Sequence, residues 1–382
     1  MALKSKLGFG MMRLPVKSDD PTDFDYEQLF RMVDLFIDAG CNYFDTSFVY
    51  HNGKSEEAVR RAVIERYPRE SVLIATKFPT FNLKSEDEIE PIFARHLENL
   101  GTEYVDYYLL HNLQTVLYDG IDGAGGVVKT CRLIDHALRW KAGGKIRHLG
   151  FSFHSSPELL DRILTEYPQF EFVQIPVNYI DWDSQLVRAR EAYEVIRKHG
   201  KRVIIMEPVK GGGLATVPEA VERRLKEMDP NASVASWAMR FASGLDGVIC
   251  NLSGMSTLEQ VKDNISTVQN LDPLTEDEKK QLFELVSVYK DAGPIGSNLS
   301  RYTGLTLHGV AVTAIMETYN ICQLQPNPGF ADDNNYFKNA VAERAHLDIF
   351  GKLPEERVVL ADGTDVTEEV LGAERWLIEH SF

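Results

Sequence analysis

Apolar runs and amphipathic segments alternate along most of the chain. Short apolar runs such as 72–76 predict strands, whereas 26–39 carries apolar residues at helical spacing. Gly40 follows that segment in the position typical of a helix C-cap. The alternation predicts an α/β fold in which helices connect successive strands.

Eight strand-like runs and their intervening helices extend over roughly 270 residues, the size expected of a (β/α)8 TIM barrel. The rival fold, a doubly wound open sheet, usually has a Gly-x-Gly-x-x-Gly loop after its first strand, and none follows the first strands here. We expect strands at 7–15, 42–45, 72–77, 104–111, 146–152, 172–177, 202–206 and 247–251. We expect helices at 26–39, 55–64, 85–100, before Lys141, after Ser156, and at 184–199, 217–228, 234–242 and from 257.

The alternation ends near Asp291. The remaining segment contains helical patterns at 311–321 and 336–345, separated by a Pro/Asn/Asp-rich loop. We therefore predict two domains, a barrel at 1–290 and an appended small helical C-terminal domain at 291–382. Its aromatic residues are expected to pack in a small core rather than to line a pocket; they are Tyr302, Tyr319, Phe330, Tyr336 and Phe337.

The formal net charge of −16 argues against non-specific binding to nucleic acid or to anionic membranes, because both need a basic surface. The four cysteines are scattered and have neither metal nor redox spacing. No signal-like N-terminus and no long apolar run is evident. We expect a cytoplasmic protein without a metal site that acts on a small molecule. Oligomerisation remains open.

Four chemically active side chains lie where predicted strands end. Asp45 and Tyr50 follow the second strand, Lys77 ends the third, and His111 ends the fourth. The carboxyl ends of all strands in a parallel barrel point to the face where barrel enzymes bind substrates. We therefore expect these four side chains to meet, although they are far apart in sequence.

This combination suits proton transfer to an oxygen that becomes an alkoxide. A nearby ammonium stabilises a phenolate, so Lys77 is expected to lower the pKa of Tyr50. Asp45 would hold Lys77 charged and oriented, and His111 would position a carbonyl. Each residue alone is ordinary at a strand end, and the prediction rests on their joint occurrence.

Two glycine-containing loops follow the last predicted strands. Gly211, Gly212 and Gly213 come after the seventh strand, and Gly254, Met255 and Ser256 come after the eighth, at the start of a helix. Barrels often bind phosphate with these two loops, through backbone amides and a helix N-terminus. We expect a phosphate site here, with a merely flexible turn as the alternative for the three glycines.

The chain resembles the aldo-keto reductase family over about residues 5–270. The resemblance implies a nicotinamide-dependent reaction between a carbonyl and an alcohol, with Tyr50 as general acid/base, Lys77 and Asp45 tuning it, and His111 orienting the substrate. The motifs that carry it are 44–47 with Tyr50, 75–77, 109–111, 145–152, Gln174 with Asn178, and 253–256 with Asn264.

The same resemblance implies a cofactor site. Ser152 and Gln174 would contact the nicotinamide carboxamide, and Met206 stands where the family often stacks an aromatic ring. Relatives that prefer NADP clamp its 2′-phosphate with a Lys and an Arg, at positions that match Gly254 and Gln260. Because neither Gly254 nor Gln260 is charged, we expect NAD or NADP as the cofactor, with no basis for a preference for NADP.

One branch of the family carries a ferredoxin-like C-terminal domain with cluster-binding cysteines. The window 297–306 has that spacing, and the branch also favours the phrase 150–154. Hydroxyls do not replace thiolates as iron–sulfur ligands, so we expect no iron–sulfur cluster. Hydroxyl residues occupy the cysteine positions: Ser297, Ser300, Thr303 and Thr306.

Two other functions remain open. A retained NAD would allow a redox-neutral reaction at a sugar hydroxyl, in which the substrate is oxidised transiently and then reduced again. A non-catalytic, cofactor-sensing subunit of a larger assembly is the second alternative, and the intact set of four side chains argues against it.

Overall fold

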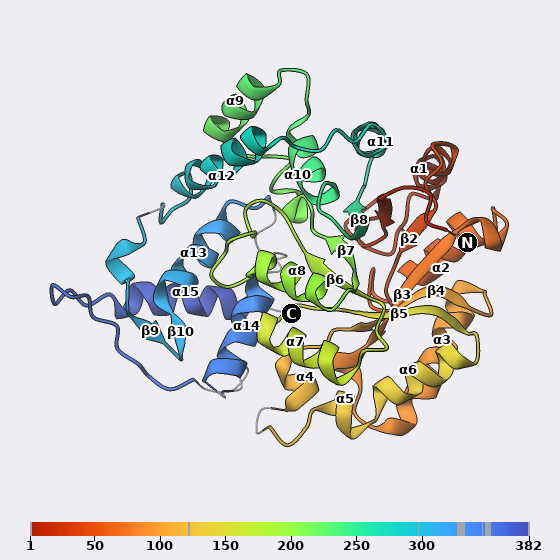
Figure 1. The fold of residues 1–382 in the computed structure, drawn as a ribbon, viewed down its shortest axis with the longest axis horizontal. Coiled ribbons are helices and arrows are strands. Elements are labelled where there is room, and N and C mark those ends of the chain that lie inside the picture. The colour runs from red at the N-terminus through yellow and green to blue at the C-terminus, as the bar shows by residue number, and fades with distance from the viewer. Residues whose placement is uncertain are drawn as a thin grey trace.

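The structure is a computed structural model, and it describes residues 2–120, 123–296, 298–326, 333–345, 347 and 353–380. Eight parallel strands form a closed barrel in the order β1 to β8, and β8 pairs with β1 (Figure 1). The predicted (β/α)8 barrel is therefore confirmed. The strands are β1 (Leu7–Gly10), β2 (Tyr43–Asp45), β3 (Leu73–Pro79), β4 (Val105–His111), β5 (Ile146–Ser152), β6 (Phe172–Pro176), β7 (Arg202–Met206) and β8 (Val248–Gly254).

Helices surround the barrel because each presents an apolar stripe to the strands, as α1 does with Leu29, Met32, Val33 and Phe36. These helices are α1 (Tyr26–Asp38), α2 (Ser55–Val59), α3 (Ile89–Leu100), α4 (Thr115–Asp119), α5 (Val127–Thr130), α6 (Leu133–Ala142), α7 (Pro157–Glu166), α8 (Ala189–Lys198), α9 (Glu219–Met228), α10 (Val234–Ser243), α11 (Leu258–Gln269) and α12 (Glu276–Asp291). A π-helical turn, Arg60–Ile64, extends α2, and short 3-10 turns lie at Arg69–Ser71, Thr80–Asn82, Glu86–Glu88, Lys210–Gly212 and Ser300–Tyr302.

The segment after β4 differs from the prediction of a loop followed by one helix. Three short helices replace it, and Arg132, with a left-handed φ of 54°, separates α5 from α6. Gly126 is packed so closely that a Cβ on it would lie 2.2 Å from the carbonyl oxygen of Leu117. This packing joins the start of α5 to α4, a contact that the apolar pattern does not encode.

The C-terminal extension begins after α12 and is helical, as predicted. It contains a two-stranded hairpin, β9 (Thr306–Leu307) with β10 (Val310–Ala311), and α13 (Val312–Gln323), α14 (Asp333–Arg344) and α15 (Thr367–Glu379). The hairpin and α15 were not predicted. Tyr302, Tyr336 and Phe337 are buried and Tyr319 packs against Trp376, which confirms core packing for these four. Ser297 and Phe330 lie outside the described residues.

The extension packs on the barrel at the loops that follow β5, β6 and β7 (Figure 1). The Ser156 hydroxyl, which caps α7, donates to Glu343 of α14 at 2.5 Å. The Thr313 hydroxyl of α13 donates to Gln185 at 3.0 Å. These contacts place the extension close to the face on which the candidate residues were predicted to meet.

Among the described residues, none of the helices is long and apolar enough to cross a membrane.

Candidate active site

The candidate residues at the strand ends point into the barrel because they lie on the same face of their strands as a buried cluster of side chains inside the barrel. That cluster includes Tyr43, Ala75 and Leu109, all almost fully buried. Side chains two residues apart on a strand face the same side. The residues two positions further along are Asp45, Lys77 and His111, and the same spacing relates Phe172 to Gln174 and Ile204 to Met206.

Lys77 and Asp45 form a buried ion pair at the carboxyl ends of β3 and β2. Lys77 is 1% exposed and Asp45 is 3% exposed. The ammonium donates to Oδ1 of Asp45, and it donates to the carbonyl oxygen of Thr46 at 2.7 Å. Burial lowers the pKa of Lys77, but Asp45 and Tyr50 outweigh burial and hold this pKa above its ordinary value. Lys77 is therefore a fixed cation.

Tyr50 lies beside this cation, with its ring centroid 4.7 Å from the Lys77 nitrogen. Burial raises the pKa of Tyr50, Lys77 lowers it, and Asp45 raises it. The predicted lowering by Lys77 is therefore present, but burial outweighs it, and the net pKa lies above the ordinary value. The sequence argument included the neighbouring charge but not the loss of water around the phenol. Tyr50 consequently holds its proton at neutral pH.

His111 completes the group. Its Nδ1 lies 3.3 Å from the Ser47 hydroxyl, and its ring centroid is 6.3 Å from that of Tyr50. The ring of Phe81, which is 47% exposed, meets His111 edge-on at 5.6 Å. The structure thus brings together all four predicted side chains, with an exposed aromatic ring beside them.

Ser152 and Gln174 are neighbours across β5 and β6. Both are almost fully buried. Gln174 directs its amide nitrogen to the sulfur of Met206 at 3.5 Å, while its Oε1 has no partner among the described residues. A buried amide oxygen without a partner is costly, which fits a position completed by a bound molecule. A primary carboxamide, the polar group of nicotinamide, would supply the missing donor.

The three glycines after β7 have different surroundings. Gly211 and Gly212 have left-handed φ values of 62° and 103°, and a Cβ on Gly212 would meet nothing within 4 Å. A Cβ on Gly213 would lie 2.1 Å from Oε1 of Gln325, which belongs to the C-terminal extension. Gly212 is therefore open to a ligand and Gly211 lies beside Arg13, whereas a side chain at Gly213 would displace the end of the Gln325 side chain.

The residues after β8 shape a second loop. The Ser256 amide donates to Gln260 at 2.7 Å, and the Asn264 amide donates to the Ser253 hydroxyl at 2.8 Å. Met255 is fully buried. Gln260, Asn264 and Met255 therefore fix the loop with their side chains, and Gln260 also occupies the Ser256 amide, which leaves Gly254 and its neighbouring backbone as the surface available to a ligand.

Sequence reasoning missed Arg13, which lies between the two glycine loops. A Cβ on Gly254 would lie 3.2 Å from Cδ of Arg13, and a Cβ on Gly211 would lie 3.2 Å from its guanidinium nitrogen. The Arg13 carbonyl accepts from the Ser256 hydroxyl at 2.8 Å. The only signal in the sequence is a basic residue in the loop after the first strand. No ion pair of this guanidinium occurs within the described ranges.

No group of three or more His, Cys, Asp or Glu residues suited to a metal ion occurs among the described residues. In the window proposed for lost cluster ligands, Ser300, Thr303 and Thr306 are all exposed. Cys322 is buried elsewhere, beside Asn334.

Comparison with known proteins gives a consistent result. The model of the aldo/keto reductase family matches residues 6–287. The uncharacterized oxidoreductase YqkF of Bacillus subtilis is 25% identical over 309 residues, which cover 73% of this chain and 91% of that protein.

Solved structures share the fold. The holo form of aldo-keto reductase AKR11C1 from Bacillus halodurans has a TM-score of 0.57 at 24% identity, covering 74% of this chain and 92% of that one. An aldo-keto reductase from Klebsiella pneumoniae in complex with NADPH has a TM-score of 0.58 at 18% identity, covering 75% and 96%. The family match ends within α12, before the C-terminal extension begins.

Proposed function

We propose, on the premise that this chain belongs to the aldo/keto reductase family, that it transfers a hydride between a nicotinamide cofactor and a carbonyl or secondary alcohol. The observation that carries the proposal is the buried Lys77–Asp45 pair beside Tyr50 at the mouth of the barrel. It combines a proton donor with a fixed positive charge, and His111 stands next to the donor, Tyr50.

Each side chain has a proposed role in carbonyl reduction. Tyr50 donates its proton to the oxygen that becomes the alcohol, since its raised pKa keeps the phenol protonated at neutral pH. Lys77 stabilises the phenolate that remains, and Asp45 holds Lys77 in place. His111 orients the carbonyl, and the ring of Phe81 shields that side from water. In alcohol oxidation the phenolate accepts the proton.

The residues present fit a nicotinamide dinucleotide. Oε1 of Gln174 would accept a hydrogen bond from its carboxamide. Arg13 and the backbone of the two glycine loops would bind its phosphates. The bound nicotinamide supplies or accepts the hydride. A relative of known structure binds NADPH, and Arg13 gives this chain a cation near Gly254, so we propose that NADP is accepted alongside NAD.

We further propose that residues 1–290 and 291–382 are separate domains, and that the second descends from a ferredoxin-like domain that has lost its cluster. The spacing of the hydroxyl residues in 297–306 supports this descent. The role left to the extension is then mechanical, through its contacts with the barrel loops.

The test is Tyr50→Phe, assayed with NADPH and NADH against aromatic aldehydes, quinones and sugars. We expect turnover to fall by about 10²- to 10⁴-fold, while nucleotide affinity, measured by quenching of protein fluorescence, changes less than twofold. Tyr108→Phe is the matched control, because the Tyr108 hydroxyl is buried without a partner among the described residues.

Wild-type turnover in Tyr50→Phe would refute the assignment. Stoichiometric release of NAD on denaturation, with no net redox change of the substrate, would favour the redox-neutral alternative. Nucleotide binding without turnover on any substrate, together with a stably bound partner protein, would favour the sensing alternative.

A further inference from the structure

A cavity of about 380 Å³ lies between the barrel and the C-terminal extension. One wall is the loop between β6 and α8 with the first turn of α8, and the other is formed by β10, α13 and α14. None of the described residues that line it belongs to the proposed catalytic group or to the proposed cofactor site. The charged and aromatic residues of the lining are Trp182, Asp183, Arg188, Arg190, Glu191 and Arg344.

Two of the three arginines in the lining have acidic partners. Arg188 donates to both carboxylate oxygens of Glu158 in α7, at 2.8 and 2.7 Å, and it pairs with Glu191 at 2.5 Å. Arg190 pairs with Asp183 at 2.7 Å, and both of these side chains are more than half exposed. Such exposed pairs stabilise a protein little, so the Arg190 guanidinium can exchange its carboxylate for a bound anion. Arg188 is a fixed part of the wall.

Arg344, at the end of α14, brings the third guanidinium to the cavity from the extension. It is exposed, and its guanidinium has no hydrogen bond or ion pair with another described residue. A guanidinium keeps its charge in proteins and presents its donors as a fork that fits a carboxylate or a phosphate. In a chain with a formal net charge of −16, a cavity lined by such a group is a local attractor of anions.

Two further features define the ligand. The N-terminal end of α8 lies at the cavity, because Arg190 of its first turn lines it, and the positive end of a helix dipole stabilises negative charge. Apolar surface lies beside the charges, since Trp182 is half-buried, with its ring packed edge-on against Phe241 at 5.4 Å. Ala311 and Ala314 contribute apolar surface from the opposite wall. The cavity thus fits an oxyanion that carries a carbon skeleton.

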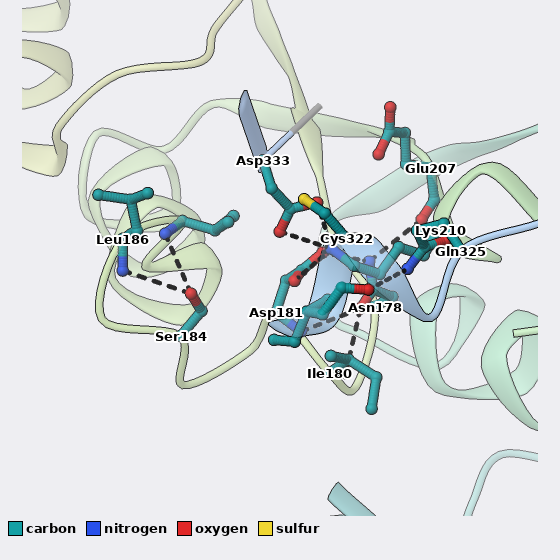
Figure 2. Close-up of polar contacts among 12 residues, drawn as sticks. Asn178, Ile180, Asp181, Ser184, Leu186, Glu207, Lys210, Cys322, Gln325 and Asp333 are labelled. Atoms are coloured by element: carbon teal, nitrogen blue, oxygen red, sulfur yellow. Dashed lines mark hydrogen bonds and ion pairs between the residues drawn. The ribbon is translucent and has the colours of Figure 1, made fainter. Parts of the chain in front are cut away.

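A buried ion cluster beside the cavity holds its two walls together. Lys210 donates to both carboxylate oxygens of Asp181 at 2.7 Å, and to those of Asp333 at 2.8 and 2.7 Å (Figure 2). Asp181 precedes the loop wall directly, and Asp333 begins α14. Within the loop, the Ser184 hydroxyl accepts from the Leu186 amide at 3.3 Å (Figure 2). The cavity is therefore preformed, and a ligand does not have to order its walls.

From this geometry we infer that the cavity binds a small organic anion through a carboxylate or phosphate group, with Arg344 and Arg190 as its cationic partners. A bound anion then contacts both the extension and the barrel, and it ties the two together. The inference goes beyond the proposed function and does not depend on it, because the residues involved take no part in the proposed hydride transfer or cofactor binding.

The test uses the full chain with phenyl phosphate and benzoate as probes, one for each oxyanion. Titration followed by tryptophan fluorescence gives the Kd, because Trp182 lines the cavity. Hydrogen exchange of peptides that cover 182–191 and 311–318 locates the site. We expect saturable binding of at least one probe, and slower exchange in both peptides when that probe is bound.

In Arg344→Gln we expect the Kd to rise at least about tenfold, because a charged donor to the oxyanion is lost. This variant retains the fold, since Arg344 has no side-chain partner to lose in the described part of the chain. Arg13→Gln is the matched control, because it removes an arginine from the proposed phosphate site, and its Kd should stay within about twofold of wild type. Trp182→Phe should remove the fluorescence change, which assigns the signal to the cavity.

The outcomes separate the two proposals. Binding of only one probe identifies the oxyanion as a phosphate or a carboxylate and supports the inference. No binding of either probe, or binding that Arg344→Gln leaves unchanged, would overturn it. A Kd raised by Arg13→Gln instead would place the anion at the proposed cofactor site and would overturn it as well. Failure of the wild type to bind either NADPH or NADH would overturn the proposed function and leave this inference standing.

Discussion

The Lys77–Asp45 pair makes a quantitative prediction about stability. Lys77→Met leaves a buried carboxylate whose Oδ2 already has no partner among the described residues. Removing one member of a buried ion pair costs about 3–5 kcal/mol. Protonation of Asp45 limits this cost, because a neutral carboxyl can be buried without a cation. Protonating a carboxyl with an ordinary pKa of about 3.9 costs about 1.4 kcal/mol per pH unit above that value. The cost is therefore about 4 kcal/mol at pH 7 and about 1.5 kcal/mol at pH 5.

The sign of the pH dependence follows from the direction of the pKa shift. Burial raises the pKa of Asp45 even with Lys77 present, and losing Lys77 raises it further. A carboxyl whose pKa is higher in the folded state contributes stability at low pH, and this stability is lost as the pH rises. We therefore expect the free energy of unfolding of Lys77→Met to fall as the pH rises from 5 to 7, by at most about 1.4 kcal/mol per pH unit, relative to the double variant Lys77→Met/Asp45→Asn.

Urea unfolding followed by circular dichroism at pH 5, 6 and 7 measures the difference in unfolding free energy between Lys77→Met and the double variant. The titration of all other groups cancels in this difference. If this difference does not change with pH, Asp45 is not the buried carboxylate that Lys77→Met leaves without a cation. Lys279→Met is the control, since Lys279 pairs with Glu276 at 2.7 Å on the surface. We expect it to cost less than about 0.5 kcal/mol at every pH.

Two other predictions concern the loops of the cofactor site. Arg13→Gln is expected to raise the Kd for NADPH about tenfold and to weaken the salt dependence of binding, because it removes a charged donor from the phosphates. Fluorescence titration at two salt concentrations measures both effects. An unchanged Kd would place the phosphates elsewhere. Gly213→Ala is expected to destabilise the protein by about 1–3 kcal/mol through its clash with Gln325. Gln325→Ala should relieve most of that cost in the double variant, as measured by urea unfolding, and no relief would mean that the clash lies elsewhere.

The barrel was predictable because every strand and nearly every helix repeats one local pattern. Strand alternation then determines which side chains face inward, so the convergence of Asp45, Lys77 and His111 follows once the strands are assigned. The net pKa of Tyr50 was not predictable in this way. It depends on how much water the folded chain removes from the phenol, which no spacing of residues records.

The C-terminal extension was less predictable because its contacts join distant segments. Lys210 and Asp333 are 123 residues apart, and neither stands in a recognisable motif. The hairpin Thr306–Ala311 is too short to produce an alternating pattern. In contrast, α15 buries Val370, Ala373 and Leu377 at helical spacing, so its pattern was present in the sequence but was hidden among acidic residues. Charged residues that pair across such separations look like surface residues in the sequence.

The three consecutive glycines show how the two parts of the molecule depend on each other. A flexible turn would tolerate a side chain at each position, but Gly211 faces the Arg13 guanidinium, whereas Gly213 faces Gln325 of the extension. Gly212 between them has open space and a φ of 103°, where any other residue is strained. Gly211 and Gly212 are thus required by their positive φ values, whereas Gly213 is favoured by its contact with Gln325. The two ends of this glycine run consequently contact different parts of the molecule, the loop after β1 at Gly211 and the C-terminal extension at Gly213.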